Sequence, residues 1–185
     1  MTIIPQEVTM KKKIIFLLLL LTPLLATSVS AYTFLGGKHS KTNLRVVVKS
    51  GTKSKYEDFI YDAARDWSNT PTKINMSVYL GGGGDIYFGG DNYGNTDWNA
   101  RCTNFREYIW YGDYTTSSIE MNYDLMDSRS NLYNTATINH ELGHALGLDH
   151  VDDSYQIMYH TGNPARKVYT PQSDDIDGVN ALYGK

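Results

Sequence analysis

The apolar positions in the first part of the chain follow two different periods. Residues 44–48, LRVVV, form a short β-branched run that is typical of a strand. Residues 54–69 place their large apolar side chains three and four positions apart, with polar residues between them, at Tyr56, Phe59, Ile60, Ala63, Ala64 and Trp67. This spacing predicts an amphipathic helix, which Thr70 and Pro71 are expected to end.

The middle of the chain is dominated by short strand patterns. Residues 74–80 alternate between apolar and polar side chains, and a run of glycines separates them from a second candidate strand at 85–89. A loop rich in glycine, asparagine and aspartate is predicted from 90 to about 104. Two further strands, joined by a polar turn, are predicted at 106–112 and 118–124.

Two helices are predicted in the last third. One runs from about Asn131 to Leu146. The other covers residues 172–184, with acids in its first turn and apolar residues on one face. The chain has 185 residues, enough for one domain with a real core and hardly enough for two.

The N-terminal region has the features of an export signal. Three lysines at 11–13 precede an unbroken apolar run at 14–21, and small residues at 29–31 suit cleavage. This order predicts a secretory signal peptide over residues 1–31, with Met10 as an alternative start. The apolar stretch ends by about Ala26, short of the roughly 20 residues that a membrane span needs. The mature protein, residues 32–185, is therefore expected to be secreted, extracellular and without a membrane span.

Charge and cysteine content narrow the choice of partners. The whole chain has a net charge of −3, and residues 1–31 contribute three lysines against one glutamate, so the mature domain is near −5. Nucleic acid is not an expected partner, because phosphate binding needs clustered positive charge and none is visible. Cys102 is the only cysteine, which excludes an internal disulfide. We interpret it as a partly buried apolar residue, with a reactive thiol or an intermolecular bridge as alternatives. A monomer is expected.

The segment HELGHALGLDH, residues 140–150, contains three of the five histidines. On a helix, His140 and His144 lie one turn apart on the same face, where both can bind one ion. Gly147 offers no ligand, but it allows a sharp turn that brings His150 back from another direction. Three neutral imidazoles with one open position are typical of a catalytic zinc site, since a structural site takes four ligands.

Glu141 indicates what the open position does. It lies about 100° around the helix axis from His140, so it flanks the ion. Zinc lowers the pKa of its bound water toward 7, and a carboxylate beside that water can take its proton and pass it to a leaving amine. The alternative is an ordinary amphipathic helix with scattered histidines, which has chance odds on the order of 10⁻⁴.

The same eleven residues resemble the H-E-x-x-H-x-x-G-x-x-H signature of the metzincin zinc endopeptidases. Met158, in SYQIMYH, resembles the methionine turn of that clan, and QSDDIDGVNALYGK resembles the closing helix of its matrixin branch. The similarity extends over residues 44–185. It implies an α+β, metzincin-like fold: a twisted five-stranded mixed sheet with one antiparallel edge strand, two backing helices, and a small C-terminal subdomain with a third helix.

The resemblance also implies roles for individual residues. The zinc ligands would be His140, His144 and His150, the general base Glu141, and the supporting residues Met158 and Gly147. Residues 159–171 would wall a specificity pocket, and Tyr159 and His160 are candidate accessory residues. The edge strand that pairs with an extended substrate would be 106–112. Of Asp174 and Asp175, one would brace the methionine turn and the other would pair with the mature amino terminus.

Two metal sites of the family are harder to place. Matrixins usually hold a second, structural zinc through histidines in the middle of the domain, yet no histidine lies between His39 and His140. That site is expected to be absent or rebuilt from carboxylates. Calcium is a further candidate cofactor, near the acids Asp85, Asp91, Asp113 and Asp124. Solvated loop acids are the favoured interpretation, because no ligand pattern is evident.

These observations predict a secreted, zinc-dependent endopeptidase that hydrolyses peptide bonds in proteins through a zinc-activated water. Its partners would be protein or peptide substrates, and its cofactor one catalytic Zn²⁺. One alternative is a secreted zinc-binding adhesion or toxin module without proteolysis, which the intact Glu141 disfavours. A zinc hydrolase that acts on another amide is disfavoured by the complete signature and its methionine.

Overall fold

The computed structural model describes residues 32–108, 112–160 and 166–185. The predicted signal peptide, residues 1–31, lies outside the described residues. The remainder of the chain forms one compact unit. Within the part that is described, no helix is both long enough and apolar enough to span a membrane.

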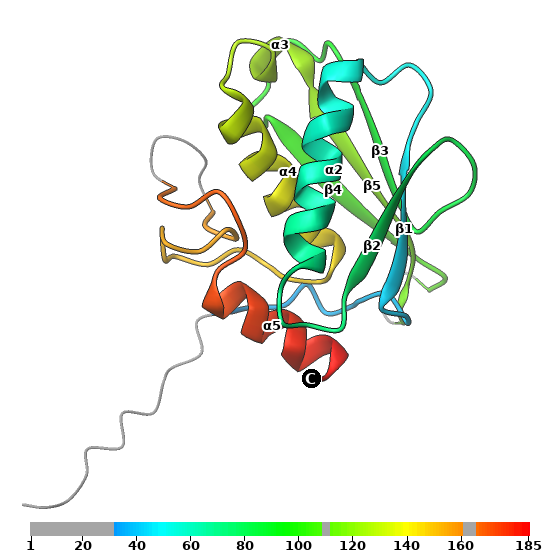
Figure 1. The fold of residues 1–185 in the computed structure, drawn as a ribbon, viewed down its shortest axis with the longest axis vertical. Coiled ribbons are helices and arrows are strands. Elements are labelled where there is room, and N and C mark those ends of the chain that lie inside the picture. The colour runs from blue at the N-terminus through cyan, green and yellow to red at the C-terminus, as the bar shows by residue number, and fades with distance from the viewer. Residues whose placement is uncertain (1–31, 109–111, 161–165) are drawn as a thin grey trace, which may run out of the picture. The chain divides into compact units, whose positions relative to one another are not determined.

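A five-stranded mixed sheet forms one layer of the molecule (Figure 1). Its strands are β1 (Asn43–Val48), β2 (Asn75–Leu80), β3 (Ile86–Asp91), β4 (Ala100–Arg106) and β5 (Tyr114–Asn122). Their order is β2-β1-β3-β5-β4. All neighbouring pairs are parallel except β4 and β5, which are antiparallel. The prediction of a mixed sheet with one antiparallel edge strand is confirmed.

The positions of the last two strands were predicted wrongly. β4 ends at Arg106 and therefore shares only that residue with the predicted 106–112, of which 109–111 lie outside the described residues. β5 begins at Tyr114 and ends at Asn122, so it starts and stops earlier than the predicted 118–124. The sequence of β4, ARCTNFR, alternates between exposed and partly buried residues. An edge strand that is solvated on one face contains many polar residues, which makes its sequence resemble a loop.

Helices cover one face of the sheet (Figure 1). They are α2 (Ser54–Ser68) and α4 (Asn131–Ala145), and both match the predicted segments closely. The last helix, α5 (Ser173–Tyr183), follows the methionine turn. The single-turn helix α3 (Tyr123–Met126) was not predicted, because one turn is too short to show a helical period.

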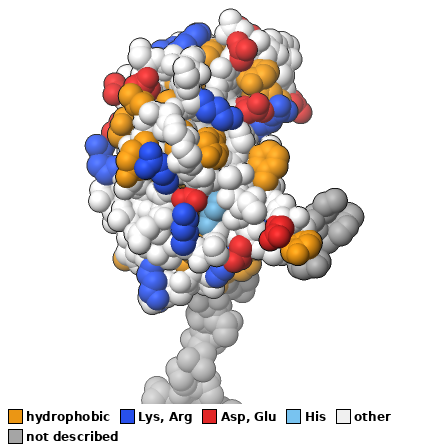
Figure 2. Space-filling view, turned by 90° about the vertical axis from the view of Figure 1, so that its right-hand side faces the viewer, with side chains coloured by type: hydrophobic (Ala, Val, Ile, Leu, Met, Phe, Trp, Pro, Cys, Tyr) orange, Lys and Arg blue, Asp and Glu red, His pale blue; other side chains and the backbone are white. Residues whose placement is uncertain are grey.

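Surface charges of both signs are mixed. On the face in Figure 2, acidic and basic side chains are interspersed and do not form separate patches. Ion pairs on the molecule include Arg101 with Glu120 at 2.7 Å and Arg65 with Asp62 at 2.6 Å. Exposed pairs of this kind contribute roughly 0–1 kcal/mol each to stability.

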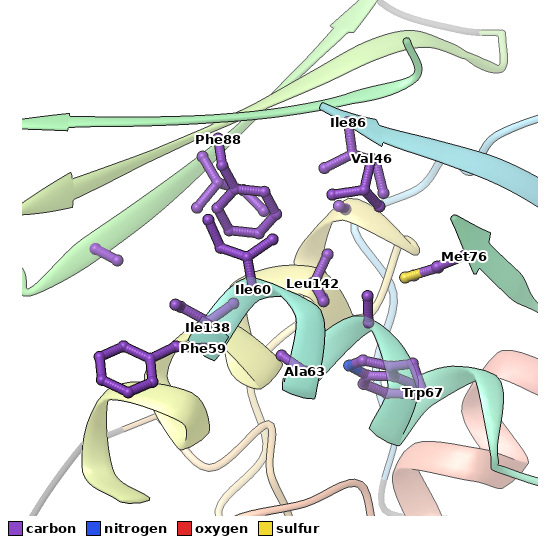
Figure 3. Packing of buried hydrophobic residues seen from close by; sticks show 14 of the residues in the cluster. Val46, Phe59, Ile60, Ala63, Trp67, Met76, Ile86, Phe88, Ile138 and Leu142 are labelled. Carbon is purple, nitrogen blue, oxygen red and sulfur yellow. The ribbon is translucent and has the colours of Figure 1, made fainter. Parts of the chain in front are cut away.

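The core lies between the sheet and the two long helices, as Figure 3 shows. Ile60 of α2 and Leu142 of α4 point toward Phe88 and Val46 of the sheet. All six apolar positions that predicted α2 are buried. The indole N–H of Trp67 also donates to the carbonyl of Asn139 at 3.0 Å, which fixes α2 against α4. The helix that carries the candidate site is therefore held rigidly by the core.

Candidate metal centre

Helix α4 places His140 and His144 one turn apart. It begins where the hydroxyl of Ser130 accepts a hydrogen bond from the backbone N–H of Tyr133, at 3.3 Å. Most residues of α4 are buried, and the helix packs against α2 and β4. His140 itself is only 6% exposed. Tight packing on several sides fixes the direction of both imidazoles.

The turn after α4 brings His150 to the same place. Gly147 has a φ of 102°, in the left-handed region. The backbone N–H groups of Gly147 and Leu148 each donate to carbonyls of the last helical turn at 3.0 Å, which is the pattern of a Schellman C-cap. A Cβ at Gly147 would also lie 2.2 Å from the carbonyl oxygen of Gly37. Glycine is thus required there for both conformation and space.

The N-terminal segment holds the loop that carries His150. The backbone N–H of Leu35 donates to the carbonyl of Gly147 at 3.0 Å, and that of Asp149 donates to the carbonyl of Thr33 at 2.8 Å. The hydroxyl of Thr33 donates to the carbonyl of His150 at 2.7 Å. Residues far apart in the sequence therefore position the third histidine together.

The three imidazoles each direct one nitrogen to a shared point. Nδ1 of His140 donates to the carbonyl of Ile157 at 2.8 Å, and Nδ1 of His144 donates to that of Leu148 at 2.9 Å. A carbonyl can only accept, so Nε2 keeps its lone pair in both rings. Nε2 of His150 lies 3.1 Å from each of these two Nε2 atoms.

This nitrogen triangle fits a zinc ion. The three ligand atoms lie within 4.8 Å of one another. Ligand atoms about 2.0–2.1 Å from a tetrahedral zinc are separated by roughly 3.3 Å, which is close to the two separations of 3.1 Å. His140 and His144 therefore face His150 with lone pairs at Nε2, and a cation at the centre of the triangle is held by all three Nε2 atoms when His150 carries its hydrogen on Nδ1.

The protonation state of the histidines suits metal binding. Burial lowers the pKa of His140 well below 6.5 and that of His144 to about 4. It also lowers the pKa of His150. Neutral imidazole is the form that binds a metal ion, so the three side chains are ready to do so at physiological pH.

Glu141 lines a cavity of about 330 Å³ together with the three histidines. Its side chain is buried. Burial raises the pKa of the Glu141 carboxyl to about 7, while the guanidinium of Arg166 and the backbone N–H of Cys102 oppose that shift. A carboxyl that titrates near 7 can both accept and return a proton at physiological pH.

Met158 lies directly against α4. A Cβ at Gly143, between the first two histidines in sequence, would lie 2.2 Å from Sδ of Met158. The carboxylate of Asp175 accepts hydrogen bonds from the backbone N–H groups of Ile157 at 2.8 Å and Met158 at 3.2 Å. Asp175 is thus the acid that braces the methionine turn. Pairing of Asp174 with the mature amino terminus stays a prediction.

His160 and Tyr159 lie next to this turn. His160 lines the same cavity as the three histidines. Its side chain is 44% exposed, and its Nε2 lies 3.7 Å from the carboxylate of Asp152. The carbonyl of Tyr159 accepts a long hydrogen bond of 3.5 Å from Arg166. Accessory roles for both residues stay predictions.

Sequence reasoning missed three groups at this site. The backbone N–H of Cys102 hydrogen-bonds Glu141, and the side-chain amide of Asn104 donates to the carbonyl of His144 at 3.0 Å. Both lie on β4, whose position had been predicted wrongly. Arg166 also lines the cavity. Its only sequence signal was its place in 159–171, the expected pocket wall, of which 161–165 lie outside the described residues.

Two of the four acids considered for calcium have other partners. Asp85 accepts a hydrogen bond from the backbone N–H of Arg45 at 2.8 Å and pairs with Lys41. Asp124 accepts a hydrogen bond from the backbone N–H of Gly94 at 2.6 Å. In the described ranges, the three histidines are the only group of three or more potential ligands placed to hold a metal ion. Calcium binding stays a prediction.

One family model and one known protein match this chain over most of its length. The sequence model of the Matrixin family matches residues 37–184. Interstitial collagenase B from Mus musculus is 28% identical over 170 residues, which cover 83% of this chain and 35% of that protein. Metalloendoproteinase 1 from Glycine max is 34% identical over 88 residues, which cover 46% of this chain and 26% of that protein.

A shorter match is more similar in sequence. Matrilysin from Homo sapiens is 47% identical over 47 residues, which cover 25% of this chain and 18% of that protein. Across these comparisons the chain spans about a third or less of the length of each relative.

Proposed function

The chain belongs to the matrixin family, and on this premise we propose that it is a zinc-dependent endopeptidase that hydrolyses peptide bonds in proteins. The observation that carries the proposal is the cavity in which three imidazole Nε2 atoms lie beside a buried carboxylate. The chain spans only part of the length of its relatives, so their individual substrates are not assigned to it.

Each side chain of the site has a role in this proposal. His140, His144 and His150 hold one zinc ion. The chemistry that zinc supplies when bound is to polarise the scissile carbonyl and to lower the pKa of a water molecule. Glu141 accepts a proton from the attacking water and returns it to the leaving amine nitrogen, for which a pKa of about 7 is suitable. Gly147 and Met158 keep the ligands in place.

Strand β4 offers a way to hold the substrate. It is the edge of the sheet beside the cavity, since residues from Ala100 to Cys102 line that cavity. An extended peptide can add to such an edge strand through backbone hydrogen bonds. Because these bonds do not involve side chains, they hold peptides of many sequences equally well. Selectivity then depends on the side-chain pockets.

We also propose that the protein is secreted. The support is the sequence of residues 1–31, where lysines, an apolar run and small residues follow one another as in a signal peptide. Residues 32–185 would then be the mature enzyme. Sequencing the amino terminus of protein from the culture medium tests this, and a start other than Tyr32 contradicts the assigned cleavage.

The endopeptidase proposal is tested with purified residues 32–185. The protein is incubated with casein, with and without a zinc chelator, beside the variants Glu141→Gln and Glu57→Gln. Glu57 lies on α2 and serves as the matched control. We expect cleavage that the chelator stops, and a loss of about 10²-fold or more in kcat/KM for Glu141→Gln alone, because general acid–base catalysis is removed.

Zinc content separates loss of chemistry from loss of metal. The Glu141→Gln variant should still hold one zinc ion per chain, as measured by elemental analysis. Cleavage that resists the chelator, or an equally active Glu141→Gln, would contradict the mechanism. A folded, zinc-loaded wild type that cuts no protein or peptide would favour the binding module instead.

A further inference from the structure

The cavity beside Glu141 contains a second charged group. Arg166 lines this cavity of about 330 Å³ together with Glu141 and His140. Tyr133 and Thr137 of α4 contribute neutral parts of the wall. A peptide whose scissile bond lies at Glu141 would therefore place a neighbouring side chain within reach of a guanidinium.

The guanidinium of Arg166 is only partly satisfied. Its Nη1 donates to the carbonyl of Ala136 at 3.2 Å, and its Nη2 to that of Tyr159 at 3.5 Å, the limit of a hydrogen bond. Its Nε is buried and has no hydrogen-bond partner among the residues that the structure describes. Nη1 and Nη2 each carry two hydrogens and donate one of them to a carbonyl, so each keeps a second hydrogen for a ligand.

No carboxylate neutralises this cation at close range. Across the described residues, no acidic side chain lies within 4.0 Å of Arg166. Glu141 and Asp175 act on it electrostatically from further away. Arg166 is half-buried, and a cation that has lost part of its water without gaining a partner is unfavourable, whereas a paired one gains from the lower dielectric around it.

We propose that Arg166 is a specificity-determining residue that selects substrates with an acidic side chain next to the scissile bond. The proposal rests on the proposed endopeptidase function. A carboxylate matches a guanidinium with two parallel hydrogen bonds, and it would supply the missing counter-charge. The carboxylate of Glu141 repels an acidic substrate side chain in the same cavity, so the preference depends on direct contact between that side chain and Arg166.

The first experiment compares matched peptides. A cleavable peptide is made with Glu, Gln or Leu at each of the two positions that flank the scissile bond. For wild type we expect kcat/KM to be about tenfold or more higher for Glu than for Gln at one of the two positions, because the amide leaves the cation unpaired. Equal rates for Glu and Gln at both positions would overturn the proposal.

Variants then assign the preference to the residue. In Arg166→Met the ratio of kcat/KM for the Glu peptide to that for the Gln peptide should fall to about one or below, while the Leu peptide is still cut. Arg166→Lys should keep part of the preference for Glu. Lys167→Met removes the adjacent exposed cation and should leave the ratio unchanged. If Arg166→Met lowers kcat/KM equally for all three peptides, Arg166 is merely structural and the proposal fails.

A binding readout separates this inference from the proposed function. Fluorescence anisotropy gives the Kd of the same peptides for zinc-loaded Glu141→Gln, with and without Arg166→Met. If the Glu peptide binds more tightly than the Gln peptide, and Arg166→Met abolishes the difference, the role of Arg166 is supported. This holds even if wild type cuts nothing, because the lack of cleavage would contradict only the endopeptidase proposal. Equal Kd values for Glu and Gln peptides would overturn the role of Arg166.

Discussion

The three candidate ligands are oriented by three separate parts of the chain. Carbonyls of Ile157 and Leu148 accept from Nδ1 of His140 and His144, and the N-terminal Thr33 donates to the backbone of His150. A carbonyl that accepts from Nδ1 fixes the tautomer and the direction of a metal-ligating histidine, whereas the contact of Thr33 fixes only the backbone of His150. Leu148 belongs to the signature HELGHALGLDH, but Ile157 and Thr33 do not, so the site also depends on residues outside that signature.

Gly147 provides a residue-scale prediction. In Gly147→Ala the new methyl group clashes with the carbonyl oxygen of Gly37. The substitution also forces a residue with a side chain into the left-handed region of φ. We expect a loss of about 1–2 kcal/mol from backbone strain and roughly 1–3 kcal/mol from the clash, measured by urea unfolding at fixed zinc concentration. Gly51→Ala is the control, since its φ of 88° is similar but nothing lies near its Cβ. Equal losses in the two variants would refute the steric argument.

The sequence was informative about residues whose role depends on local spacing. His140, His144, His150 and Gly147 follow from helix geometry and a turn, and the structure brings them together. Arg166 could not be found in this way, because its place in the cavity depends on how the segment after Met158 folds back onto α4. One arginine in a polar stretch has no period to reveal it.

At the scale of elements, Asp127 joins α2 to the end of α3. Its carboxylate accepts from Lys53 and Lys55, each at 2.6 Å, and from the hydroxyl of Tyr56 at 2.8 Å. Burial alone would raise the pKa of Asp127, but these hydrogen bonds outweigh it and hold the pKa well below 3.8. The charged carboxylate therefore stabilises the folded state at neutral pH.

Asp127→Asn should lower the free energy of unfolding by about 1 kcal/mol near pH 7, a modest value because the side chain is 40% exposed. A group whose pKa is lower in the folded state stabilises the protein at pH values above its unfolded-state pKa, about 3.9 for Asp. That stabilisation is lost as the pH falls toward the folded-state pKa. The difference in the free energy of unfolding between wild type and variant, measured by denaturant unfolding, should thus become smaller below about pH 4. Asp62→Asn, in an exposed pair with Arg65, is the control and should change stability by less than ~0.5 kcal/mol. A gap that widens at low pH would contradict this account.

Elements with a clear local signal were predicted well, and those without one were not. α2 shows amphipathic spacing over its 15 residues, whereas α4 is buried on nearly all sides and was located through the histidine motif that it carries; the bounds of both were nearly right. β4 was missed because only one of its faces is packed and its sequence is largely polar. The more apolar residues that follow it were mistaken for the strand, although residues 107 and 108 lie outside it.

At the scale of the whole molecule, the N-terminal residues 33–35 are hydrogen-bonded to residues 147–150, the loop that carries His150. Phe34 forms an antiparallel bridge with Leu148, beside the hydrogen bonds that Thr33 makes to the same loop. A protein that begins at residue 37 lacks these contacts and should lose zinc about tenfold faster or more, because supporting contacts of ligands affect metal affinity by such factors. Release to a chromophoric chelator measures this rate, with removal of the exposed Lys185 as the control. Equal release from all three proteins would show that the segment does not support the site.

The central claim is that three imidazoles and no other side chain hold one zinc ion. X-ray absorption at the zinc edge, on purified and fully loaded residues 32–185, tests it most directly. The account predicts three nitrogen neighbours and one oxygen at about 2.0–2.1 Å. Substituting His150 by alanine should remove one of the three nitrogens. A sulfur neighbour from Cys102, a shell of oxygens alone, or an unchanged spectrum in the His150 variant would contradict the account.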